Sequence, residues 1–379
     1  MNNIGLYMTN LSFKQLDNFF KNDDFPSIEK DIRGIRFLKL RSMSRKETME
    51  EFYDLHRISR SDIKSKDYFE YIFNDENITD PQINEYINVK YQKERRERAN
   101  NQDYLVDQLN RLNHFDWGSS FGNSLEKNIV NNYVKKIQSF ERINEEIEGR
   151  LLVSMRGYTL NSWYNHWTSI IIEDLFKDHT SVFPTVGLVK KIDFFIENVP
   201  FDLKVTYFPE ELLADKLKSN GYGNELTMLK RTCRTLGIFI PDDLNPKELK
   251  LHLLNKLRED QRESAKKFVK ELSRVKKEII SESERSPAEL KKWFYENQGE
   301  ARFDASNRFF LVLTNEDDMS LSWKLKRNVV FLKDKIHAHL DNLSTNTNYL
   351  DTDFYWAKNE KFYRCKSDIL FLKYGGQTY

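Results

Sequence analysis

The sequence is poor in cysteine and has no long run of apolar residues. Its only cysteines among 379 residues are Cys233 and Cys365, too few for a disulfide framework. No stretch approaches the roughly 18 consecutive apolar residues that a membrane-spanning helix needs, and the segment after Met1 lacks the basic and apolar regions of a secretory signal. We therefore expect a soluble, cytoplasmic protein without a structural disulfide.

An excess of charge of one sign is also missing. The chain carries 60 Lys and Arg against 59 Asp and Glu, which gives a net charge of +1. This balance provides no global attraction to nucleic acid, so any phosphate-binding surface has to be local. No Gly-Lys-Ser or Gly-Lys-Thr occurs, so a Walker A loop is absent and nucleotide-driven work is not supported.

The clearest candidates for catalytic residues lie between positions 189 and 205. The apolar pattern there predicts two short strands joined by a tight turn, with Asp193 on the first and Asp202 and Lys204 on the second. Alternation along the second strand places Asp202, Lys204 and Thr206 on one face. Two carboxylates and an ammonium can therefore meet. Carboxylate oxygens are ligands that Mg²⁺ prefers, and a nearby lysine can orient a nucleophilic water or stabilise a developing anion.

This pattern resembles the PD-(D/E)xK nuclease superfamily, in which a first acid is followed on the next strand by Asp or Glu, any residue and Lys. The resemblance implies a mixed β-sheet flanked by helices and DNA cleavage with Mg²⁺. Many members carry a further acid on the preceding helix. Residues 161–178 have a helical apolar face, on which Glu173 matches that acid and Asp174 is the substitute. The chain departs from the pattern at Ile192, where the motif has proline.

A second stretch satisfies the written motif more literally. Asp242 follows a proline, and Glu248 and Lys250 stand one residue apart farther along. However, Asn245 and Pro246 lead into leucines at nearly helical spacing, so we expect these acids near the start of a helix rather than on strands.

Other interpretations stay open or are weaker. In a chain that is 31% charged the motif arises by chance, and the alternative for residues 189–205 is a solvated hairpin without catalytic function. Gly118-Ser119-Ser120-Phe121-Gly122 matches a nucleophile elbow, but the half-polar residues before it do not form the buried strand that an elbow requires. His337 and His339 diverge on a helix and do not indicate zinc.

The rest of the chain is organised around this segment. Residues 1–150 are predicted to be a helical N-terminal region for recognition or dimerisation, and the charged run from Lys93 to Arg98 to be a solvated helix face. Residues 151–379 form the predicted nuclease-like core, with a helical insertion at about 236–300. In the core we expect a strand at 308–314, a helix at 322–340 and a terminal meander at 354–356, 361–365 and 369–374.

A predicted helix at 263–280 carries basic residues that can follow a phosphate backbone, although a solvated exterior face is the better explanation of them. The DNA-binding candidates are Lys266, Lys267, Lys270, Arg274 and Lys277. Two helices around Leu236-Gly237-Ile238 faintly resemble the SAP DNA-binding module.

The sequence as a whole predicts an α/β (α+β) protein with a mixed central sheet. The resemblance implies a Mg²⁺-dependent endonuclease that cuts double-stranded DNA, most like a type II restriction enzyme. Because such enzymes often pair two identical subunits, a homodimer is a further hypothesis. Asp193 and Asp202 would hold the metal, Lys204 would activate water, and Glu173 would complete the acidic shell. The alternatives are a structure-specific repair, recombination or mobile-element nuclease of the same superfamily and a non-catalytic DNA-binding protein.

Overall fold

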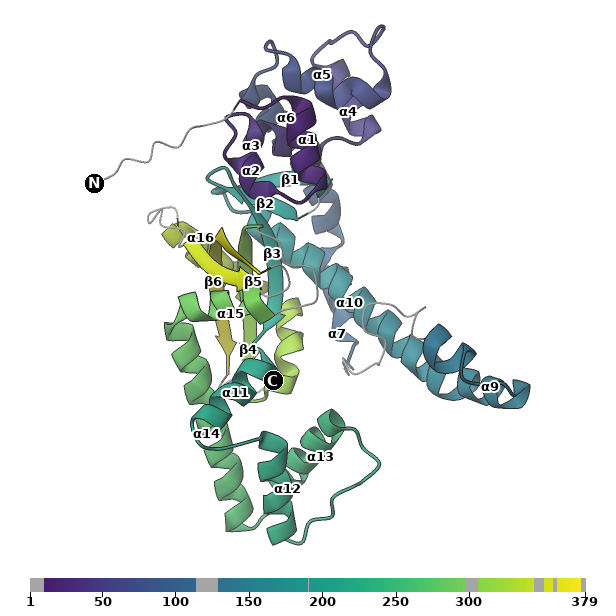
Figure 1. Cartoon of the computed structure of the whole chain (residues 1–379), viewed down its shortest axis with the longest axis vertical. Coiled ribbons are helices and arrows are strands. Elements are labelled where there is room, and N and C mark those ends of the chain that lie inside the picture. The colour runs from purple at the N-terminus through teal and green to yellow at the C-terminus, as the bar shows by residue number, and fades with distance from the viewer. Residues whose placement is uncertain are drawn as a thin grey trace.

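A six-stranded mixed β-sheet lies at the centre of the computed structural model, with helices on both faces (Figure 1). The structure describes residues 10–113, 129–189, 191–297, 306–343, 351–356 and 360–375. The expected α/β class with a mixed sheet flanked by helices is therefore confirmed. The Gly118–Gly122 segment lies outside the described residues.

The helices before the sheet form two groups. Six of the described helices pack their aromatic and aliphatic residues into one apolar cluster. These helices are α1 (Phe13–Lys21), α2 (Phe25–Glu29), α3 (Gly34–Ser42), α4 (Lys46–Leu55), α5 (Tyr68–Asn74) and α6 (Asp80–Asn100). The next helix, α7 (Gln102–Asn110), packs instead against α10, through Leu109. The short α9 (Phe140–Glu146) then precedes the long α10 (Leu152–Lys177), which contains the helix expected at 161–178.

The strand order of the sheet is β1-β2-β3-β4-β6-β5. The first three strands form an antiparallel meander, while β4 runs parallel to both β3 and β6, and β5 is antiparallel to β6. The strands are β1 (Val182–Val189), β2 (Ile192–Ile196), β3 (Val199–Tyr207), β4 (Arg308–Asn315), β5 (Asp351–Trp356) and β6 (Lys361–Tyr374). The hairpin expected within 189–205 and the strand at 308–314 are thus confirmed.

The turn between β2 and β3 explains the tight hairpin. Glu197 and Asn198 both have positive φ, at 51° and 64°, as a two-residue turn with a strand-matching twist requires. Asparagine tolerates this left-handed conformation better than most residues.

The two faces of the sheet are covered by different helices. Apolar residues of α10 and α16 (Val329–Leu343) pack with Phe309, Leu311 and Leu313 of β4. The alternate residues of β4, Phe310 and Val312, pack against α15 (Pro287–Asn297) on the opposite face. All eight residues of β4 are buried, as expected of a central strand.

In the part between β3 and β4 that the structure describes, five helices are present, and they start earlier than the insertion expected at 236–300. They are α11 (Glu210–Ser219), α12 (Glu225–Thr235), α13 (Pro246–Glu259), α14 (Glu263–Arg285) and α15. Glu248 lies in α13, where Asn245 and Glu248 cap each other's backbone at the helix start. As expected, therefore, none of Asp242, Glu248 and Lys250 lies on a strand.

Two predicted boundaries are wrong. The helix expected at 322–340 is a 3₁₀ helix at Met319–Arg327 followed by α16, because Asn328 separates them and its side chain accepts from the Phe331 amide. The last two strands of the expected meander are one strand, β6. Its first part pairs with β5 and its second part, from Ser367, pairs with β4, so the polar residues at this change of partner do not end it.

Candidate active site

Asp193 and Asp202 come together where β2 and β3 separate. The antiparallel ladder between these strands ends at the pair Phe194–Phe201, so Asp193 and Asp202 are the next residues outward on the two strands. From Asp202 onward β3 pairs with β4 instead, beginning with Asp202 opposite Arg308. A fork between neighbouring strands therefore brings two carboxylates to one point at the edge of the β3–β4 pair.

The carboxylate of Asp193 replaces the ladder hydrogen bond that is lost at the fork. Its Oδ2 accepts from the backbone N–H of Leu203 at 2.7 Å. Burial raises the pKa of Asp193 from 3.8 to about 7, and the negative charges of Glu173 and Asp202 add to the shift, while Lys204 opposes it. Three carboxyl groups therefore share one electrostatic environment, which is typical of functional sites.

Asp202 is held from two sides. The ammonium of Lys204 donates to Oδ1 at 2.6 Å, and the guanidinium Nε of Arg308 lies 3.5 Å from Oδ2. Arg308 is completely buried and lies over the ring of Tyr295, whereas the side chain of Lys204 is 42% exposed. Lys204 is thus the cation of this pair that is accessible from solvent, and Arg308 supports Asp202 from the protein interior.

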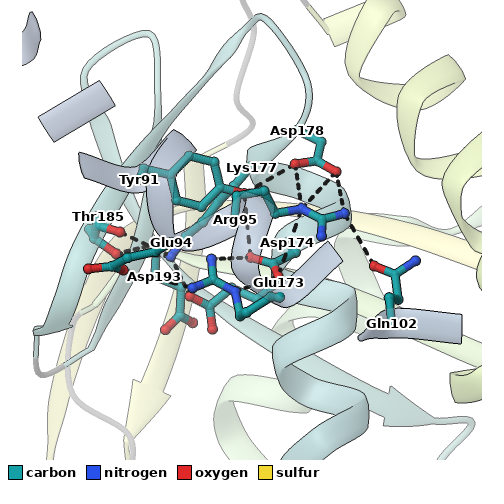
Figure 2. Close-up of polar contacts among 11 residues, drawn as sticks. Tyr91, Glu94, Arg95, Gln102, Glu173, Asp174, Lys177, Asp178, Thr185 and Asp193 are labelled. Atoms are coloured by element: carbon teal, nitrogen blue, oxygen red, sulfur yellow. Dashed lines mark hydrogen bonds and ion pairs between the residues drawn. The ribbon is translucent and has the colours of Figure 1, made fainter. Parts of the chain in front are cut away.

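Glu173 reaches the same environment from α10 (Figure 2). Its Oε1 accepts from the buried ammonium of Lys177 at 2.5 Å, and Lys177 also donates to Oγ1 of Thr185 on β1 at 3.2 Å. The Thr185 hydroxyl in turn donates to the backbone carbonyl of Asp193 at 2.7 Å. This chain of contacts ties α10 to β1 and β2 beside the fork.

The substitute candidate Asp174 has a different environment. It is buried and accepts two hydrogen bonds of 2.8 Å from Arg98 of α6, while Asp178 one turn farther is bound by Arg95 (Figure 2). Tyr91 lies between both carboxylates. Asp174 is therefore committed to a contact between helices, and Glu173 is the acid of α10 that is directed toward the fork.

These contacts correct the expectation that the run from Lys93 to Arg98 is a solvated face. Arg95 and Arg98 point from α6 to the C-terminal turn of α10, where their charges also suit the helix dipole. The alternating charges did suggest salt bridges, but only within one helix. No sequence signal indicated the partners of Arg95, Arg98 or Arg308, because these partners are distant in the chain.

Donor chemistry at the fork fits a hard divalent cation. Within the described ranges no three His, Cys, Asp or Glu side chains are close enough together to form a metal site. Mg²⁺ nevertheless requires only one or two carboxylates, since it keeps several waters. Asp193 and Asp202 provide two carboxylates on neighbouring strands, and the pKa of Asp193 is raised first by burial and then by the negative charges of Glu173 and Asp202, which a cation would offset.

The basic residues proposed for DNA binding lie on α14, which packs against α11 beyond the Tyr207 end of β3 (Figure 1). Arg274 forms ion pairs with Glu271 and Glu278, at 2.6 and 2.5 Å, which reduces its availability to phosphate. Lys266, Lys267 and Lys270 are exposed, and Lys277 lies 3.9 Å from Asp317. The structure thus separates these lysines from the fork instead of gathering them around it.

No family model, curated protein or solved structure matches the chain. Among the described helices, none has the length and apolar character needed to cross a membrane.

Proposed function

We propose that the chain is a Mg²⁺-dependent deoxyribonuclease of the PD-(D/E)xK type, most like a type II restriction endonuclease that cuts double-stranded DNA. The observation that carries this proposal is the meeting of Asp193 and Asp202 at the β2–β3 fork, with Lys204 two residues farther on the same strand. The order of α10, the meander β1–β3, and β4 parallel to β3 supports it as a mixed sheet flanked by helices.

Each residue at the fork has a distinct role in this proposal. Asp193 and Asp202 hold the cation, and Glu173 completes the acidic shell directly or through a water. Bound Mg²⁺ would lower the pKa of a water and offset negative charge on the scissile phosphate. Lys204, which is exposed on one side and bonded to Asp202 on the other, positions the attacking water or donates to a phosphate oxygen.

The decisive experiment is incubation of the protein with plasmid DNA and Mg²⁺, with EDTA as the control. We expect cleavage with Mg²⁺ only. Asp202→Ala and Lys204→Ala should each lower the cleavage rate by about a hundredfold or more. DNA binding by Asp202→Ala should be retained or strengthened, because the substitution removes repulsion between carboxylate and phosphate.

The second occurrence of the motif offers matched controls. Glu248→Gln and Lys250→Ala change the same kinds of residues on α13, away from the fork, and should cleave as the wild type does. If the fork variants cleave at the wild-type rate, or if the α13 variants are the ones that lose activity, the proposed site is wrong.

The alternatives within and outside the superfamily make different predictions. Discrete plasmid fragments indicate sequence recognition, whereas preference for branched substrates indicates a repair, recombination or mobile-element nuclease. A non-catalytic DNA-binding protein would bind plasmid or branched DNA without cleaving it, and Asp202→Ala would leave its activity unchanged. Light scattering tests the proposed homodimer, in which each subunit cuts one strand; a monomer both free and on DNA would contradict it.

A further inference from the structure

Helices α12 and α13 form a small unit with an apolar cluster of its own. Leu229, Cys233, Leu253 and Leu257 are completely buried between these helices and the start of α14. Gly237 ends α12 in the left-handed conformation, with φ of 64°, and the Ile238 amide donates back to the Cys233 carbonyl. Residues 238–245 then run without helical structure to α13.

A groove of about 640 Å³ opens between α12, this connecting segment and α13. Five of the ten residues that line it are aliphatic, including Leu226, Ile238, Ile240 and Leu249, two are prolines and three are charged. Leu226, Ile238 and Ile240 belong to the apolar cluster but are only partly buried, so the cluster is incompletely covered on this side. The volume of the groove is within the range found for binding pockets.

Two cations border the groove. Lys230 and Arg234 are one turn apart on α12, and neither forms an ion pair with any other described residue. Asp242 is the single acid among the lining side chains. Phe239, between two lining isoleucines, is 79% exposed, so apolar surface continues on the outer side of the connecting segment.

These features favour a protein ligand over a nucleic acid. Interfaces with nucleic acid are polar and strongly basic, and single strands bind by stacking on aromatic side chains. The lining here combines aliphatic residues and prolines with charges at three positions, and it contains no aromatic side chain. An apolar centre with a charged border, together with arginine and an exposed phenylalanine, is the composition of a protein interface.

We propose that this groove binds an apolar peptide segment of a partner protein that carries acidic residues beside its apolar ones. The apolar side chains of the segment cover Leu226, Ile238 and Ile240, and its carboxylates pair with Lys230 and Arg234. The inference is independent of the proposed nuclease activity, since it depends on residues of α12 and the connecting segment alone.

The test is selection of a random-peptide library against the full-length chain, followed by measurement of the affinity of individual peptides. We expect enrichment of sequences that combine apolar and acidic residues. Their affinity should fall by about tenfold or more for the double variant Lys230→Glu/Arg234→Glu, since two attractive pairs become repulsive. Arg231→Glu on the exposed side of α12 is the matched control and should bind as the wild type does.

Thermal unfolding of the double variant establishes that it is folded, and Ile240→Asp tests the apolar part of the groove separately. The proposal is overturned if selection enriches no acidic apolar peptides, or if the selected peptides bind the double variant and Ile240→Asp with unchanged affinity. It is also overturned if the double variant loses binding to duplex or single-stranded oligonucleotides while no selected peptide depends on the groove.

Discussion

Asp193 connects proton binding to stability in this protein and, under the proposed function, both of them to cation binding. Its folded pKa of about 7 exceeds the ordinary value of 3.8, so between these pH values the folded state binds more protons than the unfolded state. Stability from this group is therefore complete at low pH and is lost as pH rises to about 7. Asp193→Asn should unfold at higher urea concentration than the wild type at about pH 8, in EDTA.

The Asn variant keeps a side-chain oxygen for the Leu203 amide, so it tests the charge rather than the hydrogen bond. Its advantage over the wild type should shrink as pH falls toward about 4, where the wild-type carboxyl is also neutral. A difference in stability that does not change with pH would contradict the raised pKa of Asp193.

Mg²⁺ should reverse the penalty of ionising Asp193. A cation that binds only the folded, deprotonated site raises the melting temperature, and protons compete with it. We therefore expect a Mg²⁺-dependent rise in melting temperature for the wild type at about pH 8, a smaller rise at about pH 5.5, and none for Asp193→Asn. A rise of equal size in the Asn variant would place the cation elsewhere.

Arg308 is expected to matter because it is the buried partner of a buried carboxylate. Arg308→Met leaves Asp202 with Lys204 alone and should lower the free energy of unfolding by about 3 kcal/mol, the usual scale for breaking a buried ion pair. Cleavage should also fall, because Asp202 loses its support. Urea unfolding measures the first effect.

The comparison for Arg308 is Arg364→Met, which removes an exposed guanidinium bonded to Asp353 on neighbouring strands. An exposed pair contributes little, so this variant should unfold nearly as the wild type does. Equal losses in both variants would show that Arg308 has no special relation to Asp202.

The contact between α6 and α10 lies next to the acid of α10 that faces the fork. Arg98 binds Asp174 and Arg95 binds Asp178, which fixes this end of α10 against α6, and the neighbouring Glu173 binds Lys177 and acts on the pKa of Asp193. A double-mutant cycle of Arg98→Ala and Asp174→Asn should give a coupling energy of about 1–3 kcal/mol. Additive effects would mean that the two side chains act independently.

The same contact should also influence Mg²⁺ binding at the fork. Arg98→Ala should weaken the Mg²⁺-dependent rise in melting temperature although Arg98 does not touch Asp193 or Asp202, because Glu173 then loses its fixed position. Arg96→Ala, on the same helix and absent from this contact, is the control. If Arg98→Ala leaves the Mg²⁺ response unchanged, the α6 contact has only a structural role.

Elements with a strong local pattern could be predicted from the sequence, and long-range contacts could not. The hairpin followed from alternation of apolar residues, and β4 from a short apolar run between polar residues. The end of the β2–β3 ladder, the partner of Asp202 in β4 and the arginines of α6 depend on how distant segments pack. Sequence spacing therefore indicated Asp193, Asp202 and Lys204 but not what holds them.

Under the proposed function, the distribution of charge over the molecule decides where DNA would bind. With a net charge of +1, attraction has to come from a local surface, and Lys266, Lys267 and Lys270 of α14 are exposed candidates. They lie beyond the Tyr207 end of β3, so DNA that contacts both α14 and the fork must extend along the sheet (Figure 1).

The triple variant Lys266→Ala/Lys267→Ala/Lys270→Ala tests this arrangement. If each lysine contacts one phosphate of duplex DNA, the slope of log affinity against log salt concentration should decrease by about 2–3. The Mg²⁺ response of the fork should not change. Arg274→Ala should have a smaller effect, because Glu271 and Glu278 already neutralise this side chain. An unchanged slope in the triple variant would exclude α14 as the DNA-binding surface and direct the search to surfaces nearer Lys204.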